Sequence, residues 1–274
     1  QPNAMGGREV GGLANMLAAH MNYSPENNDR VARFWGVDEI CDGPGYKAVD
    51  LFDAVDRGEI KAIWIMATNP AVSMPDADKV ARALDKCDLV VVSDCYEHTD
   101  TSRYANVLFP ATGWGEKNGT VTNSERRISR QRALLQPPAD IRHDWQIMTE
   151  IAQRMGFTDA FDYQHPQQVF IEHAALSGFE NNGKWAFDIS ALAQLSESDY
   201  DKLTPVQWPL PANATNTKQR TKKRLFSDWK FFTEDGKANF KVIPLADITP
   251  ALVEPISSNE FVLNSGRLRD QWHT

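Results

Sequence analysis

Cysteine is scarce in this sequence. Its 274 residues include three cysteines, Cys41, Cys87 and Cys95, and no two of them have the Cys-x-x-Cys spacing of many metal sites. Three scattered cysteines are too few to hold a four-iron cluster, and an odd number without a regular pattern does not form a disulfide framework. We therefore expect three reduced thiols and a cytoplasmic location.

Two other absences restrict the partners. The sequence has no hydrophobic run long enough to cross a membrane. It has no excess of positive charge either, because 29 Lys and Arg against 37 Asp and Glu give a formal net charge of −8. Nucleic acids bind to basic surfaces, so we expect neither nucleic acid nor a membrane among the partners. A hydrophobic fraction of 42% with 24% charged residues is typical of a globular protein with one large or two modest domains.

Three short hydrophobic segments predict a parallel sheet. Residues 62–66, 89–92 and 107–109 are apolar at successive positions, as in strands covered on both faces. Residues 76–86 have apolar side chains at helical spacing, and a shorter helix is predicted at 99–105. The predicted fold class is therefore α/β: a Rossmann-like, mostly parallel sheet with flanking helices, followed by a smaller irregular or β C-terminal extension.

Apolar residues at helical spacing also predict helices at 10–20, 48–55 and 143–155, the first two packed on the sheet. The region 205–223 is rich in Pro, Asn, Thr and Lys and lacks periodicity, which is typical of a linker. Residues 225–242 predict short antiparallel strands around a turn that contains glycine. A linker is therefore expected to separate the α/β part from a smaller C-terminal part.

Polar residues follow two of the predicted strands. Asn69 lies after the first strand, and Ser93 and Asp94 follow the second. Ligands of parallel sheets bind at the carboxyl ends of the strands, where an aspartate accepts hydrogen bonds from ribose hydroxyls or guanine. A helix N-terminus expected near Ser73 would offer N–H groups to phosphate. Each of these residues by itself is typical of a turn or a helix cap, but together they favour a nucleotide site.

A glycine-containing segment follows the third strand. Residues 109–120 contain three glycines, which let backbone approach a ligand closely, and Lys117 offers a mobile positive charge. A basic run comes next, formed by Arg126, Arg127, Arg130 and Arg132. We interpret this run as a solvated strand or hairpin face in preference to a direct phosphate contact.

As strings of letters, these segments carry a more specific signal. The strings are ATNP at 67–70, VSD at 92–94, YANVLFPA at 104–111 and WGEKNGTVTNSERR at 114–127. They resemble the molybdopterin oxidoreductase family, in which two molybdopterin guanine dinucleotides surround one metal. Residues 1–12 and 264–274 agree with the same family. Within it, the likeness is greatest to the catalytic subunits of bacterial assimilatory nitrate reductases.

The resemblance implies an oxidoreductase that reduces nitrate to nitrite at a molybdenum bis(molybdopterin guanine dinucleotide) centre. It implies a central fragment, because family members begin with a Cys-rich motif for a 4Fe-4S cluster that these residues lack. The implied domains are a dinucleotide-binding α/β domain at 1–157, a helical insertion or connector at 158–204, a linker with short strands at 205–260 and the start of a C-terminal molybdopterin dinucleotide-binding domain at 261–274. The fragment alone is expected to be inactive.

The resemblance also implies roles for single residues. Arg8 is the predicted substrate-facing residue, with Gln1 as its neighbour, since a guanidinium group suits a planar oxyanion. The alternative is a structural Arg8 paired with Glu9 or another carboxylate. The implied cofactor contacts are Asn69, Ser93, Asp94, Lys117, Asp144, Ser265, Gly266, Arg267, Trp272, His273 and Thr274. For Asp144, a role as N-cap or dipole partner of its helix is a compatible alternative. No residue is assigned as a metal ligand.

The implied substrate is nitrate, and the implied electron donor is a flavoprotein, a ferredoxin or a flavodoxin. Two other functions stay open. A formate dehydrogenase catalytic subunit of the same family would share the dinucleotide contacts but would need a different metal ligand and substrate pocket. The other is a non-catalytic nucleotide-binding module, an interpretation in which the chain is complete.

Overall fold

The computed structural model of the protein describes residues 3–213, 224–242 and 261. Two units divide the chain, one spanning Pro2–Lys222 and the other Lys223–Thr274 together with Gln1. The first unit contains all the helices and strands of the described residues. The predicted site residues Gln1, Ser265, Gly266, Arg267, Trp272, His273 and Thr274 lie outside the described residues, as does the strand predicted at 261–263 apart from its first residue.

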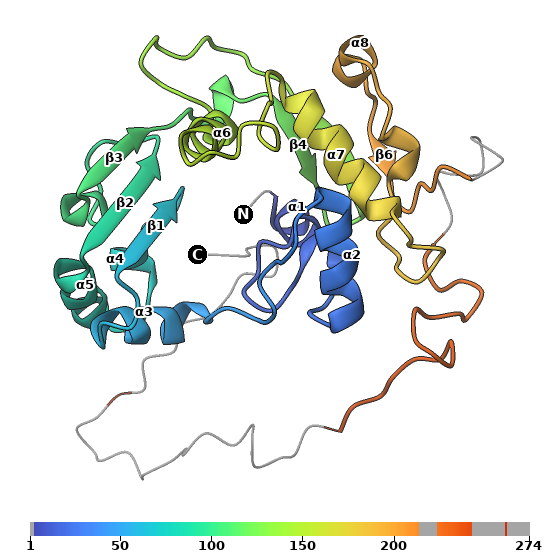
Figure 1. Ribbon diagram of the computed structural model, residues 1–274, viewed down its shortest axis with the longest axis horizontal. Helices are drawn as coiled ribbons and strands as arrows, with labels where there is room; N and C mark the ends of the chain where they lie inside the picture. Colours follow the sequence, from blue (N-terminus) through green and yellow to red (C-terminus); the bar gives the residue numbers. More distant parts are fainter. Residues whose placement is uncertain (1–2, 214–223, 243–260, 262–274) are drawn as a thin grey trace. The chain divides into compact units, whose positions relative to one another are not determined.

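A parallel three-stranded sheet lies in the larger unit. Strands β1 (Ala62–Met66), β2 (Leu89–Asp94) and β3 (Val107–Pro110) have the order β1-β2-β3, and both neighbouring pairs are parallel (Figure 1). The predicted α/β class is thereby confirmed. β2 is longer than predicted because Ser93 and Asp94 continue the ladder opposite β3.

Helices α3 (Ala48–Asp56) and α5 (Ala77–Lys86) pack against each other and against this sheet. α5 begins after Asp76, whose carboxylate accepts a hydrogen bond from the Lys79 backbone N–H at 3.3 Å, as an N-cap does. The shared apolar core consists of Phe52, Val55, Ile65, Val80, Ala83, Leu84, Val90 and Val92, each at most 6% exposed. Burial of this apolar surface holds the sheet and its helices together.

The loop after β1 differs from the prediction. The helix N-terminus expected near Ser73 is wrong, because helix α4 (Pro70–Ser73) ends at that residue. Proline is favoured at the first helical position, which explains where α4 begins. Met74 precedes a second proline and is extended, at φ −85° and ψ 149°, which explains where it ends.

The helix predicted at 99–105 is reduced to the 3-10 turn η2 (Ser102–Tyr104). The Thr99 N–H donates to the Ser102 hydroxyl at 2.8 Å, and the Ser102 N–H donates to the Thr99 hydroxyl at 2.9 Å. These reciprocal bonds have the pattern of a capping box, which favours the start of a helix. The helix stops after one turn because Ala105 is extended, at φ −71° and ψ 129°, and the Asn106 N–H already donates to the Val90 carbonyl oxygen of β2 at 2.8 Å.

The N-terminal helix does not occupy its predicted position at 10–20. Helix α1 (Ala4–Glu9) precedes that range, and the 3-10 turn η1 (Ala18–His20) lies at its end. Gly11 has φ +79°, and a Cβ atom there would lie 2.8 Å from the Ala18 backbone nitrogen. The chain therefore turns at this glycine, in a conformation that side-chain-bearing residues rarely adopt.

A second, antiparallel sheet follows in the same unit. Strands β4 (Gly119–Thr122), β5 (Arg127–Gln131) and β6 (Val206–Gln207) have the order β4-β5-β6. The hairpin interpretation of the basic run is confirmed by β5. Arg130 is not solvated, however: its side chain is 2% exposed and its guanidinium carbon lies 3.9 Å from the centre of the Tyr200 ring. This arginine therefore supports the packing of the hairpin.

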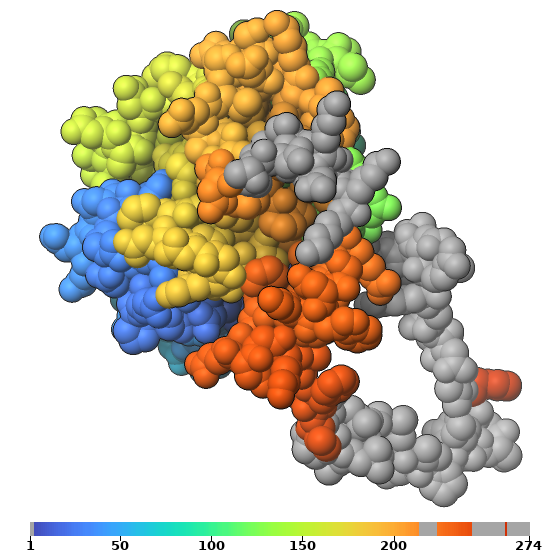
Figure 2. Space-filling view, turned by 90° about the vertical axis from the view of Figure 1, so that its right-hand side faces the viewer, coloured from blue at the N-terminus to red at the C-terminus, as the bar shows by residue number. Residues whose placement is uncertain are grey.

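Helices α2 (Pro25–Trp35) and α7 (Pro166–Gly178) lie side by side, as Figure 2 shows for the blue N-terminal residues and the yellow residues of α7. The Trp35 indole N–H joins them by donating to Glu172 Oε1 at 3.1 Å. The remaining helices are η3 (Trp114–Glu116), α6 (Asp144–Arg154), η4 (Ser190–Leu192) and α8 (Glu197–Asp201). The predicted helices at 48–55 and 143–155 are confirmed as α3 and α6. No helix within the described ranges is long and apolar enough to cross a membrane.

The smaller unit is described at residues 224–242 and 261, and these residues form no strand. The predicted turn is present, since Gly236, at φ +69°, donates its N–H to the Thr233 carbonyl oxygen at 3.0 Å. The antiparallel strands predicted around it are wrong. Phe226 and Trp229 have φ values of 61° and 59°, and such left-handed residues interrupt extended backbone.

Leu84→Ala should lower the free energy of unfolding by about 2–5 kcal/mol, because the residue is 1% exposed and its truncation leaves a cavity in the sheet core. Val72→Ala is the matched control at a position that is 61% exposed, where a change within about 0.5 kcal/mol is expected. Urea denaturation followed by circular dichroism measures both values. Equal losses at the two positions would contradict the assigned core.

Candidate functional site

Backbone hydrogen bonds lead the chain from the end of β3 to the start of α6. The Ala111 N–H donates to the Asp94 carbonyl oxygen at 2.9 Å, and the Thr112 N–H donates to the Arg142 carbonyl oxygen at 3.0 Å. Ala111 and Arg142 form a parallel bridge, which extends the parallel arrangement past β3. The first turn of α6 consequently lies beyond the carboxyl ends of the strands (Figure 1).

Two predicted cofactor contacts that are 27 residues apart meet at this edge. The Lys117 Nζ atom lies 2.5 Å from Asp144 Oδ2, and the two side chains are 28% and 29% exposed. Lys117 directly follows η3, a turn closed by a 2.7 Å hydrogen bond from the Gly113 N–H to Glu116 Oε2. The glycine-containing loop thus presents its lysine to the N-terminus of α6.

The start of α6 also carries two buried polar atoms without partners. Asp144 Oδ1 and Trp145 Nε1 have no hydrogen-bond partner among the described residues. Leaving a buried polar group unsatisfied costs about 1–3 kcal/mol. The carboxylate oxygen is an acceptor and the indole N–H is a donor, so each needs a complementary group. The unpartnered indole N–H of Trp145 was not predicted, because this residue belongs to the apolar pattern of the helix.

The charges of Lys117 and Asp144 also affect the pKa values of neighbouring groups. Burial lowers the pKa of the His143 imidazole, an effect that Asp144 partly offsets, so the ring at the N-cap of α6 is neutral at pH 7. Burial and the adjacent Asp94 raise the pKa of the Cys95 thiol, whereas Lys117 lowers it. The charge of Lys117 therefore acts both on the end of β2 and on the start of α6.

Asn69, Ser93 and Asp94 all have partners inside the protein. Asn69 Oδ1 accepts hydrogen bonds from the Thr101 backbone N–H at 3.1 Å and from the Thr101 hydroxyl at 2.6 Å. Ser93 is fully buried, and its hydroxyl oxygen accepts the Trp64 indole N–H at 2.8 Å. Asp94 Oδ1 accepts a backbone N–H two residues further on, at 3.0 Å. Asp94 thus has the turn role considered for it, whereas the side chains of Asn69 and Ser93 neither close a turn nor cap a helix. The contacts of all three residues with a cofactor stay predictions.

Arg8 and Glu9, at the end of α1, have different surroundings. Arg8 is exposed and forms no ion pair with any residue that the structure describes. Glu9 is 4% exposed, with Oε2 accepting the Thr122 hydroxyl at 2.8 Å and Oε1 accepting the Trp208 indole N–H at 2.6 Å. The alternative in which Arg8 pairs with Glu9 is therefore wrong.

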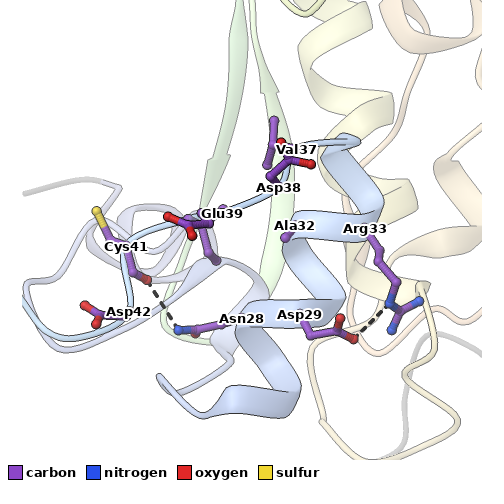
Figure 3. Close-up of a pocket in the computed structure, with 10 residues that line it drawn as sticks. Asn28, Asp29, Ala32, Arg33, Val37, Asp38, Glu39, Cys41 and Asp42 are labelled. Carbon is purple, nitrogen blue, oxygen red and sulfur yellow. Dashed lines mark hydrogen bonds and ion pairs between the residues drawn. The ribbon is translucent and has the colours of Figure 1, made fainter.

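A pocket of about 600 Å³ lies elsewhere, between α2 and the loop that follows it (Figure 3). Four carboxyl groups line it, those of Asp29, Asp38, Glu39 and Asp42. Arg33 in its lining is held by Asp29 at 2.9 Å and by Glu180 at 2.7 Å. Because this surface is negative and its arginine is neutralised, it suits neither a phosphate nor an oxyanion. None of the predicted site residues lies in the pocket.

The fold and the site define the class of the protein as an α/β protein with a candidate ligand site at the carboxyl ends of a parallel sheet. Residues 4–154, more than half of the chain, match the family model described as molybdopterin oxidoreductase. The chain belongs to the molybdopterin oxidoreductase family, as the resemblance of its motifs indicated.

Curated relatives match the whole chain. It is 52% identical over 274 residues to a nitrate reductase of Klebsiella oxytoca and 47% identical over 280 residues to a nitrate reductase of Shewanella frigidimarina. An F420-dependent formate dehydrogenase subunit alpha of Methanocaldococcus jannaschii is 28% identical over 277 residues. Each alignment covers 100% of this chain but 30%, 29% and 37% of the respective relative. The chain therefore spans well under half the length of these relatives.

A solved structure shares the fold. The acetylene hydratase from Pelobacter acetylenicus superposes with a TM-score of 0.51 at 19% sequence identity. The superposition covers 77% of this chain and 26% of the hydratase. At this identity the likeness concerns the fold alone.

Burial raises the pKa of Glu9 from 4.5 to about 7, although its hydrogen bonds to Thr122 and Trp208 act in the opposite direction. The folded protein then holds the proton more tightly than the unfolded chain. Glu9 should therefore lower the free energy of unfolding progressively as pH rises from about 4.5 to about 7, and not further above pH 7. Across this window the wild type should lose about 3 kcal/mol relative to Glu9→Gln, which cannot titrate.

Urea denaturation of both proteins at a series of pH values measures this difference. Groups that titrate in both proteins, such as His20, cancel in the comparison. A difference independent of pH would show that Glu9 titrates normally.

Proposed function

We propose that the chain is part of a molybdenum oxidoreductase that reduces nitrate to nitrite. The observation that carries the proposal is the Lys117–Asp144 pair at the sheet edge, whose second carboxylate oxygen is buried and lacks a partner among the described residues. Nitrate is favoured because proteins named nitrate reductase are 52%, 47% and 37% identical over the whole chain, against 28% for the formate dehydrogenases.

The proposed cofactor is molybdenum bis(molybdopterin guanine dinucleotide). Asp144 would accept hydrogen bonds from the N–H donors of a guanine ring, and Lys117 would hold the carboxylate in place. When bound, the cofactor supplies the two-electron chemistry, while the chain binds and orients it. The unsatisfied Asp144 oxygen at the start of α6 fits this ligand because guanine offers N–H donors.

Arg8 is the proposed contact for nitrate, with Gln1 as its neighbour. The guanidinium group of Arg8 is exposed and has no carboxylate partner among the described residues, so its donors are available to a planar oxyanion. The proposal also includes a 4Fe-4S cluster held by residues outside 1–274. The proposed electron donor is a flavoprotein, a ferredoxin or a flavodoxin. The predicted domain ranges 1–157, 158–204 and 261–274 and a cytoplasmic location belong to the proposal as well, the latter supported by three free cysteines. The linker with short strands predicted at 205–260 does not, because Val206–Gln207 pairs with β5 and residues 224–242 form no strand.

Two other functions predict different results. A formate dehydrogenase, supported by relatives at 28% identity, would oxidise formate and leave nitrate unchanged. A non-catalytic nucleotide-binding module would bind GDP but support no turnover at any length of chain. Residues 1–274 alone are expected to reduce no nitrate, because the proposed cluster and part of the cofactor site lie outside them.

Asp144→Asn should weaken GDP binding about tenfold to a hundredfold, because it removes the charged acceptor while keeping the shape of the side chain. Asp140→Asn, at an exposed position of the preceding loop, is the matched control and should bind like the wild type. Isothermal titration calorimetry with GDP measures the three affinities. Equal affinity of Asp144→Asn and wild type would remove Asp144 from the proposed site.

Arg8→Ala should lower kcat/KM for nitrate about a hundredfold or more, since a charged contact to the oxyanion is lost. The assay uses the protein expressed to the full length of its relatives and loaded with cofactor, with a reduced viologen dye as electron donor and nitrite as the measured product. Arg82→Ala, exposed on α5, is the control and should leave kcat/KM unchanged. Formate oxidation without nitrate reduction would favour the formate dehydrogenase alternative.

A further inference from the structure

Glu9 joins three segments that are distant in the sequence. Its carboxyl group connects α1 to Thr122 of β4, 113 residues away, and to Trp208 after β6, 199 residues away. Both oxygens are bonded, and the residue is 4% exposed. Breaking such a buried arrangement leaves polar groups unsatisfied, so the three segments are held together tightly.

Helix α1 depends on support of this kind. It has six residues, two of them glycines, and its N-cap Asn3 makes no capping hydrogen bond. A helix of this length is not stable by itself. Thr122 holds both of its ends, because its backbone N–H donates to Asn3 Oδ1 at 2.9 Å and its hydroxyl donates to Glu9. Gly6 makes room for the first of these bonds, since a Cβ atom there would lie 2.1 Å from Asn3 Oδ1.

The donor on the other side of Glu9 is equally fixed. Trp208 is 4% exposed, and its ring packs edge-on against His20 at 5.5 Å and Phe187 at 5.4 Å between ring centres. The indole N–H therefore points at Glu9 from a side chain that has little freedom to move. We call the contacts of Glu9 with Thr122 and Trp208 the Glu9 clamp.

We propose that Glu9 is a positioning residue, whose clamp fixes α1 and thereby the point from which Arg8 reaches an oxyanion. Consecutive helical residues point about 100° apart, which is why Glu9 faces inward while Arg8 faces solvent. No carboxylate of the described residues orients the Arg8 guanidinium, so its place is set through the backbone of α1. The inference rests on the proposed role of Arg8 in nitrate reduction.

The test compares variants in the full-length, cofactor-loaded protein. Glu9→Ala removes the clamp, and Trp208→Phe removes one hydrogen bond while keeping a ring in place. Both should lower kcat/KM for nitrate about tenfold to a hundredfold, because small misplacements of a binding group are costly. Glu9→Gln keeps a carbonyl acceptor for the indole N–H and should stay within about threefold of wild type.

A double-mutant cycle separates positioning from general destabilisation. If Glu9 acts through Arg8, Glu9→Ala should have no further effect on kcat/KM in an Arg8→Ala background. Leu84→Ala, which loosens a core cluster that contains no residue of α1, should act equally in both backgrounds. Equal effects of Glu9→Ala with and without Arg8 would overturn the proposal.

Hydrogen–deuterium exchange supplies a readout that does not depend on activity. Peptides covering residues 3–9 should exchange faster in Glu9→Ala than in wild type and Glu9→Gln, as expected for a released helix. Unchanged exchange would also overturn the proposal. A wild-type holoenzyme that reduces no nitrate would instead overturn the proposed function and with it the role of Arg8, while the exchange rates would still show whether the clamp holds α1.

Discussion

The backbone hydrogen bonds that join residues 110–112 to Asp94 and Arg142 determine where the polar groups of the candidate site lie. They extend the parallel arrangement beyond β3 and place the first turn of α6 at the carboxyl ends of the strands. Without them, the loop that carries Lys117 would not be tied to the segment that leads into α6. With them, a lysine and a carboxylate meet at 2.5 Å at the edge where parallel sheets bind ligands.

Elements that bury one continuous apolar face were predictable from the sequence, and those shaped by single residues were not. β1 and α6 match their predicted ranges because apolar spacing decides both. The range 10–20 has the same helical spacing, yet the left-handed Gly11 and its close approach to Ala18 turn the chain there. Periodicity reports which residues are buried but not whether the backbone between them is regular.

The candidate site shows the same division. Lys117 and Asp144 were predicted as cofactor contacts, and the structure pairs them. Ser93 was predicted on equal grounds, but its hydroxyl is fully buried against the Trp64 indole N–H. The sequence identifies which residue types stand at strand ends, whereas the direction of each side chain depends on partners supplied by other strands. Trp64 lies 29 residues before Ser93 in the sequence, so the residues around Ser93 do not indicate this hydrogen bond.

Net charge imposes a further constraint on how this chain can recognise anions. With a formal charge of −8, many of the described Lys and Arg side chains have a carboxylate close by, as Arg33 and Arg57 have at 2.7 Å. A cation paired in this way offers little attraction to a second anion, because its field is already neutralised. Oxyanion recognition therefore requires a guanidinium that carboxylates do not reach. Arg8 meets this condition among the described residues because the adjacent carboxyl group, that of Glu9, is turned inward and held by Thr122 and Trp208. The same contacts that fix α1 thus also keep Arg8 free of its nearest acidic neighbour.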